Sequence, residues 1–177
     1  MKYPALFDPA EEGGFVITFP DWDWGVTQGE DEADALDMAQ DALITMIAHS
    51  IRHGKPIPPP SSQPKGKKYR MIELPAKVAL KTELYIAFKA SGITKTALAR
   101  KLGIPKTNVD RLFDFKYHTR LEQIEAAFHA LGKGLTLDVR DAAQGEGPPA
   151  QPDATEANKK ARAAAWVTLK AFRDKVN

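Results

Sequence analysis

The sequence contains no cysteine among its 177 residues. Disulfide bonds and thiolate metal sites are therefore excluded, and the chain needs no oxidising compartment in order to fold. The first residues, MKYPALFDPAEE, lack the apolar run of about 7 to 15 residues that an export signal requires. No segment approaches the roughly 18 apolar residues of a membrane span. These absences predict a soluble, cytoplasmic protein with no membrane partner.

Patterns typical of catalysis are also scarce. His49 and His53 have the i, i+4 spacing of a helix, but the sequence offers no evident third ligand for a metal ion. Two-metal phosphodiester cleavage needs carboxylates inside strands, whereas Asp8, Asp21 and Asp23 stand at strand ends or in a corner. No phosphate-binding glycine-rich loop and no GxSxG motif is present. We therefore expect no catalytic residue, no metal ion and no cofactor.

The net charge of +2 conceals a strong division along the chain. Residues 1–54 carry two basic and eleven acidic side chains, so their net charge is 2 − 11 = −9. Residues 55–92 give 8 − 2 = +6, and residues 93–140 give 9 − 5 = +4. An acidic module repels phosphate and attracts a basic partner, whereas a basic module has the charge that nucleic acid attracts. The pattern predicts two modules with different partners.

The first module is expected to contain a small sheet. Apolar residues alternate in 3–7 and again in 15–19, on either side of the turn-forming DPAEEGG, which predicts a hairpin. A third short strand is expected at 25–27, after the corner PDWDWG, and a fourth at 69–74. Together with one helix, these strands give the order ββ(β)αβ in a domain of residues 1–74.

The helix of this module is expected to begin after Asp31, a suitable N-cap, with Asp34 at the acidic position of a capping box. Apolar residues follow at helical spacing, and they are Leu36, Ala39, Leu43, Ile47 and Ile51. Gly54 can end the helix in the left-handed conformation. The proline-rich PIPPPS then predicts a connector rather than a helix or strand.

From residue 75 onward the apolar pattern is helical. Helices are expected at 75–91, 94–102, 106–113 and 120–131, followed by a short terminal strand at 135–139. We assign residues 75–140 to an all-α domain that carries this strand, so the fold class is α+β. Residues 141–158 are rich in Gly, Pro and Ala and predict a flexible linker. Residues 159–177 predict a C-terminal helical extension of unknown role.

The segment KTALARKLGIPKTNVDRLF, residues 95–113, has the pattern of a helix-turn-helix. Ala99 is small where the two helices cross, Gly103 can adopt positive φ in the turn, and Val109 locks the second helix onto the first. The other apolar supports are Leu98, Leu102, Ile104 and Leu112. The pattern favours a DNA-binding domain over an ordinary pair of helices.

In a helix-turn-helix the N-terminal part of the second helix faces the major groove. The side chains expected there are Lys106, Thr107, Asn108, Asp110 and Arg111. Asparagine can bond adenine and arginine can bond guanine, each through two hydrogen bonds. The cations expected at phosphates are Lys95, Arg100, Lys101, Lys106 and Lys116. One such unit covers a short half-site, so we expect a homodimer or higher oligomer on double-stranded operator DNA.

Four pieces of the sequence, in this order, resemble the HicB-type antitoxins of bacterial toxin-antitoxin systems. They are MKYPALFDPAEEGGFVITFPD, GVTQGEDEADALDMAQDAL, the PIPPPS connector and LARKLGIPKTNVDRLF. The resemblance covers about residues 1–140. It implies a partial, catalytically inactive ribonuclease H-like N-terminal domain that binds and blocks a small basic HicA-type mRNA interferase toxin. It also implies a C-terminal domain that represses the promoter of its own operon.

The resemblance and the charge together indicate acidic residues that face the toxin. These candidates are Asp21, Asp23, Glu30, Asp31, Asp34 and Asp37. The corner DWDWG departs from the Asp-x-Pro-Gly of the family, and its Trp22 and Trp24 are either core residues or a contact hot spot. Two alternatives stay open at this point. One is a stand-alone repressor with a ligand-sensing N-terminal domain, and the other is a ribonuclease H-like nuclease.

Overall fold

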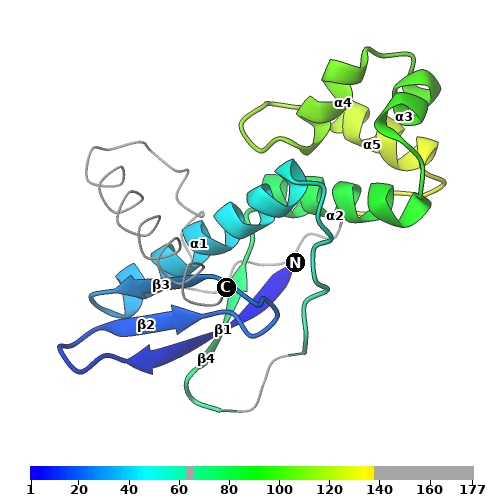
Figure 1. Ribbon diagram of the computed structural model, residues 1–177. Helices are drawn as coiled ribbons and strands as arrows, with labels where there is room; N and C mark the ends of the chain where they lie inside the picture. The colour runs from blue at the N-terminus through cyan, green and yellow to red at the C-terminus, as the bar shows by residue number, and fades with distance from the viewer. Residues whose placement is uncertain (63–65, 138–177) are drawn as a thin grey trace. The chain divides into compact units, whose positions relative to one another are not determined.

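The computed structural model of the chain describes residues 1–62 and 66–137 (Figure 1). Three features expected from the sequence lie outside these residues, wholly or in part. The linker at 141–158 and the helix at 159–177 lie wholly outside, and the expected strand at 135–139 is described only as far as Leu137.

The described residues form two compact units. The first unit consists of Met1–Met46 and Pro58–Leu74. The second consists of Ile47–Ile57 together with the residues from 75 to 137. The end of the first long helix therefore belongs, by its contacts, to the second unit.

Four strands form one antiparallel sheet in the first unit (Figure 1). They are β1 (Lys2–Pro9), β2 (Phe15–Thr18), β3 (Val26–Gly29) and β4 (Tyr69–Glu73), in the spatial order β3-β2-β1-β4. The predicted hairpin is confirmed, with Phe7 opposite Ile17. β3 begins one residue later and ends two residues later than the expected strand at 25–27.

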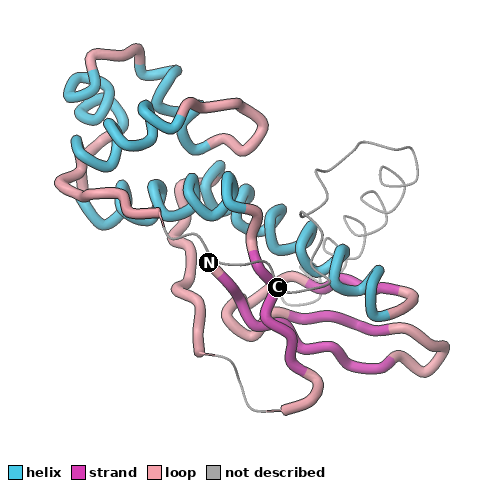
Figure 2. Tube along the Cα trace, turned by 180° about the vertical axis from the view of Figure 1, so that it is seen from behind, coloured by secondary structure: helices cyan, strands magenta, loops and turns pink. Residues whose placement is uncertain are grey.

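The part of helix α1 (Glu32–Arg52) that belongs to the first unit, up to Met46, lies along one face of this sheet, as Figures 1 and 2 show from opposite sides. Alternate strand positions supply the sheet side of the core, which contains Tyr3, Ala5, Phe7, Ile17, Phe19 and Ile72. The helix side contains Ala35, Ala39, Leu43 and Met46. The apolar series expected from the sequence is wrong at its first member, because 38% of Leu36 is exposed and Ala35 is buried in its place.

The start of α1 is fixed by a close approach and by two capping bonds. A Cβ atom on Gly29 would lie 2.4 Å from the Ala35 Cα, so only glycine allows β3 and α1 to come this close. Asp31 is the predicted N-cap, since its Oδ1 accepts from the Asp34 N–H at 2.9 Å. The Asp34 carboxylate accepts from the Glu30 N–H at 2.9 Å, one residue earlier than in a standard capping box. These contacts set the rotation of the helix and turn Ala35 toward the sheet.

Four helices form the second unit. They are α2 (Ala76–Ser91), α3 (Lys95–Leu102), α4 (Lys106–Phe113) and α5 (Leu121–Ala130), each within one residue of its expected bounds. Both α2 and α3 contact α4 and α5. The strand expected at 135–139 is wrong for its described part, because residues 135–137 belong to no strand and Leu137 is 61% exposed. The described part of this unit is helical and offers no strand for pairing.

A tight turn at Gly103 joins α3 to α4. Gly103 has a φ of 65°, in the left-handed region that its place in the pattern predicts. Its N–H donates to the Arg100 carbonyl at 3.3 Å, and the Ile104 N–H donates to the Ala99 carbonyl at 3.1 Å, which ends α3 as a Schellman motif. The residues expected to hold the two helices together are mostly buried: Leu98, Ala99, Val109 and Leu112 fully, and Leu102 and Ile104 by half.

Candidate functional site

Polar side chains line one face of α4. Lys106, Thr107 and Arg111 are exposed, and Asn108 is half-buried. The opposite face is buried and consists of Val109, Leu112 and Phe113. Because Pro105 precedes the helix, no side chain caps its N-terminus, and the first backbone N–H groups lack a side-chain acceptor. This face can therefore meet an anionic partner through both side chains and backbone.

Several of the predicted DNA-binding residues hold one another in place. The Arg111 Nη1 donates to the Asn108 Oδ1 at 3.3 Å, and the Arg111 guanidinium lies 5.2 Å from the centre of the Tyr117 ring. Lys95 Nζ and Asp110 Oδ1 form an ion pair at 2.6 Å, with both side chains partly exposed. Asn108 and Arg111 are thus oriented before any partner binds. Asp110 neutralises part of the charge of Lys95.

The remaining predicted cations lie around α3 and after α4. Arg100 and Lys116 are exposed. Lys101 is also exposed, but its Nζ donates to the Ala130 carbonyl at 3.0 Å, which ties α3 to the end of α5. Lys101 therefore has a structural role in addition to any contact with a phosphate.

A groove of about 400 Å³ opens beside α4 within the second unit. Its walls include side chains from α3, α4, α5 and the two connections between them, namely Leu102, Ile104, Leu112, Tyr117 and Ala126. Asn108 and Arg111 line it as well. These two residues therefore lie both on the polar face of α4 and at the edge of the groove.

Lys81 is a charged residue that the sequence did not single out. It lies on α2 with no exposed surface, and its Nζ donates to the carbonyls of Arg111, Asp114 and Tyr117 at 3.1, 2.6 and 2.9 Å. The pKa of Lys81 is lowered to about 8, first by burial and then by the charge of Lys77, while the charge of Asp114 acts in the opposite direction. This lysine links α2 to the end of α4 and to the loop after it.

The acidic candidates of the first unit divide into two groups. Asp31 and Asp34 accept backbone N–H groups at the start of α1, and the Asp21 Oδ2 accepts from the Ser61 N–H at 3.0 Å. Each of these three residues has a structural function in the isolated chain. The remaining candidates, Asp23, Glu30 and Asp37, are exposed.

The two tryptophans of the corner form an aromatic cluster with Tyr3. The ring centres of Tyr3 and Trp22 lie 6.2 Å apart, and those of Trp22 and Trp24 also lie 6.2 Å apart, edge to face. Both tryptophans are half-buried. The Trp22 Nε1 is buried and has no hydrogen-bond acceptor among the residues that the structure describes. The pair is thus part of the core and part of the surface, a combination common at protein interfaces.

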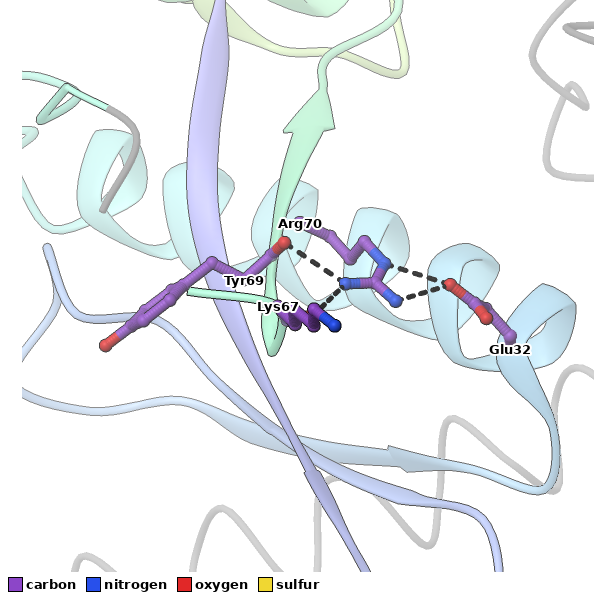
Figure 3. Close-up of polar contacts among 4 residues, drawn as sticks. All are labelled: Glu32, Lys67, Tyr69 and Arg70. Atoms are coloured by element: carbon purple, nitrogen blue, oxygen red, sulfur yellow. Dashed lines mark hydrogen bonds and ion pairs between the residues drawn. The ribbon is translucent and has the colours of Figure 1, made fainter. Parts of the chain in front are cut away.

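Arg70 makes a connection that no local pattern predicts. Figure 3 shows its guanidinium between the Glu32 carboxylate and the backbone carbonyls of Lys67 and Tyr69. The Glu32 Oε1 accepts from Nε at 2.9 Å and from Nη2 at 2.7 Å. Glu32 stands in the first turn of α1 and Arg70 in β4, so the ion pair holds the start of the helix to the edge strand of the sheet.

The structure changes the division of charge that the sequence suggested. Lys67, Lys68 and Arg70 belong to the first unit, where Lys68 also pairs with Asp8 at 2.9 Å. Even so, the described residues of the first unit have four basic and twelve acidic side chains, so the net charge is 4 − 12 = −8. Those of the second unit give 13 − 5 = +8. The two units are therefore of opposite charge.

Within residues 1–62 and 66–137, no three His, Asp or Glu side chains gather as a metal site would require. The rings of His49 and His53 lie 4.1 Å apart near the end of α1, without a third ligand in that range. No helix in the same range has the length and hydrophobicity needed to cross a membrane.

Comparison with known proteins decides the family. Residues 2–83 match the family described as HicB_like antitoxin of bacterial toxin-antitoxin system. The Antitoxin HicB of Escherichia coli (strain K12) is 40% identical over 137 residues, which is 77% of this chain and 98% of that protein. The chain belongs to the HicB antitoxin family. Antitoxin HicB 1 of Photorhabdus laumondii is 37% identical over 139 residues, which is 78% of this chain and 87% of that protein.

The similarity to HicB antitoxins extends beyond the first unit. An alignment of 137 residues within a chain of 177 must include residues 41–137, and so both α3 and α4. A chain from a solved structure, "Toxin-Antitoxin complex from Streptococcus pneumoniae", matches with a TM-score of 0.37 and 20% identity. That match covers 61% of this chain and 92% of the other. The sequence relatives, not this structural match, establish that the chain is an antitoxin of a toxin-antitoxin system.

Proposed function

We propose that this HicB-family chain binds and blocks a HicA-type toxin through its first unit and represses its own operon through its second unit. The observation that carries the proposal is the separation of charge, −8 in the first unit and +8 in the second, counted over the described residues. In this proposal the first unit is a catalytically inactive, partial ribonuclease H-like domain. The second is a helix-turn-helix domain with α4 as its reading helix.

The DNA half of the proposal is supported by the polar face of α4. Lys106 and Thr107 stand exposed in its first turn, where a reading helix approaches the bases. Arg111 is held by Asn108 and by the Tyr117 ring, so little side-chain freedom is lost when it contacts a base. The positive charge of the unit attracts DNA regardless of sequence, and the oriented side chains select the sequence. A homodimer would place two such helices on a palindromic operator.

The toxin half is supported by the acidic surface of the first unit. Asp23, Glu30 and Asp37 are exposed, so they can meet a basic protein without losing a structural bond made by their neighbours. Charges of this kind raise the rate of association with an oppositely charged partner. Trp22 and Trp24 offer half-exposed aromatic rings in the same unit, and such rings often contribute most to affinity at an interface.

The DNA half is tested with a fluorescent duplex that covers the region directly upstream of the gene for this chain. Fluorescence anisotropy should show binding that weakens in Lys106→Ala and Arg111→Ala. Lys133→Ala is the matched control, because Lys133 is an exposed lysine of the same unit outside α3 and α4. Equal losses in Lys106→Ala and Lys133→Ala would mean that binding depends on net charge alone and that α4 is not the reading helix.

The toxin half is tested by co-expression with the small basic protein encoded beside this gene. We expect the two to co-purify and the RNA cleavage by the toxin to stop. The double variant Asp23→Asn and Asp37→Asn should slow association at low salt, while Glu125→Gln, an exposed acid of the second unit, should not. Absence of any complex on gel filtration would contradict the toxin half and leave the DNA half standing.

A further inference from the structure

The N–H donors of the Lys81 ammonium group match the surrounding carbonyls in number and direction. A protonated lysine has three N–H donors, and here each has a backbone carbonyl, from Arg111, Asp114 and Tyr117, within 3.1 Å. A neutral lysine has two N–H donors and a lone pair. Loss of the proton therefore leaves one carbonyl facing a lone pair, and the three carbonyls can no longer keep the same arrangement around the nitrogen.

The three carbonyls belong to the segment that carries the polar face of α4. Arg111 lies in the last turn of α4, Asp114 is the residue that caps its C-terminus, and Tyr117 lies in the following loop. The side chains of Arg111 and Tyr117 contact each other, with 5.2 Å between guanidinium and ring. The Arg111 carbonyl also accepts from the Thr119 hydroxyl at 3.5 Å. One buried cation thus holds the backbone on both sides of the Arg111–Tyr117 contact.

We propose that Lys81 is a positioning residue for DNA reading: its charged ammonium group holds α4 and the loop 114–117 so that Arg111 points at the operator, and affinity falls when that charge is lost. The proposal rests on the proposed DNA-binding function. Because Lys81 is fully buried, its role in this proposal is indirect and requires no contact with DNA.

The position of Lys81 also makes its charge sensitive to pH. Burial lowers the pKa of Lys81 to about 8, whereas an exposed lysine keeps its proton beyond pH 9. The charged groups that act on it are Lys77, which lowers its pKa, and Asp114, which raises it. Both α4 and α5 pack against α2, and their charged and titratable side chains are exposed: Lys106, Asp110 and Arg111 on α4, and Glu122, Glu125 and His129 on α5.

The test measures affinity for the upstream duplex by anisotropy from pH 7 to pH 9 at constant salt. The wild-type affinity should fall about tenfold, because with a pKa of about 8 roughly a tenth of the folded molecules keep the proton at pH 9. Lys81→Met should bind at least about tenfold more weakly at pH 7 and show no such pH dependence. Lys81→Arg stays charged over the whole range, so its affinity should not vary with pH.

Two further variants sharpen the assignment. Lys77→Met removes a positive charge that lowers the pKa of Lys81, so the midpoint of the pH dependence should move upward. Lys133→Met removes an exposed lysine of the same unit and should leave the midpoint unchanged. A wild-type affinity that stays constant between pH 7 and pH 9 would overturn the proposal.

A second measurement needs no DNA. The backbone amide NMR signals of residues 111–119 in the free protein should shift with the same midpoint as the Lys81 Cε signal, and Lys81→Met should abolish that shift. If these amides do not respond while Lys81 titrates, the positioning role is refuted whether or not the chain binds DNA. If they respond but the wild type binds no duplex at any pH, the proposed DNA-binding function fails, and with it the reading role of Lys81.

Discussion

Replacing Lys81 with methionine removes a fully buried charge while keeping a similar side-chain length, and we expect the resulting change in stability to depend on pH. At any single pH, the change in the free energy of unfolding combines two opposing effects. The variant avoids the free-energy cost of burying an ammonium ion, but it leaves three carbonyls without their donor. Because methionine does not titrate, the way this difference in stability changes with pH reports the protonation of Lys81.

The sign follows from the two pKa values. The pKa of Lys81 is about 8 in the folded chain and 10.5 in the unfolded chain, so between these values the unfolded state binds more protons. Stability of the wild type relative to Lys81→Met therefore rises with pH across this window, and it falls as pH drops through 8. Each pK unit is worth about 1.4 kcal/mol, which gives a relative gain of about 2 kcal/mol between pH 7 and pH 9.5.

Urea unfolding followed by circular dichroism, at several pH values from 7 to 9.5, measures this difference. Tyr85, whose pKa is raised by burial, is present in both proteins and its effect cancels in the comparison. Lys133→Met provides the control for loss of an exposed lysine. A difference in the free energy of unfolding that stays constant over this range would refute the lowered pKa of Lys81 in the folded chain.

Four further outcomes follow from single positions in the structure. Asn108→Ala and Arg111→Ala should each weaken operator binding by about 1 to 3 kcal/mol in anisotropy titrations, and the double variant should lose less than the sum because the two side chains contact each other. Gly29→Ala should destabilise the chain by about 3 kcal/mol in thermal unfolding, because its Cβ meets the Ala35 backbone at 2.4 Å. A Cβ atom at Gly103 meets no atom within 4 Å. Gly103→Ala should therefore destabilise the chain only through its positive φ, by roughly 1 to 2 kcal/mol. Asp31→Ala should cost about 1 kcal/mol of thermal stability through loss of the N-cap.

Signals that act within a few residues predicted most of the helices and strands. Gly103 needs only its own freedom to adopt a φ of 65°, and Asp31 needs only the N–H three residues later. The alternation around the DPAEEGG turn predicted the hairpin for the same reason, because neighbouring strands in sequence pair locally. Such features are visible in the sequence since both partners stand close together in it.

Features that depend on distant residues could not be predicted in this way. The approach of Gly29 to Ala35 sets the rotation of α1, so periodicity alone wrongly placed Leu36 in the core. The pairing of Arg70 with Glu32 joins residues 38 positions apart. Arg70 itself was expected in the first module, on the strand at 69–74, but its partner was not. The partners of the proposed site residues, such as Asp110 for Lys95, likewise emerge only when α3 and α4 are folded together.

The burial of Lys81 could have been predicted from the sequence, but its hydrogen-bond partners could not. It stands between Val78 and Tyr85 on a stripe of buried residues that continues to Phe88, with spacings of three, four and three. A lysine in such a stripe is unusual enough to predict burial with hydrogen-bond partners. Only the fold supplies those partners, because the carbonyls lie 30 to 36 positions away. The same proton then has two opposite effects: its loss makes folding more favourable, yet it removes a donor that the arrangement around Arg111 requires.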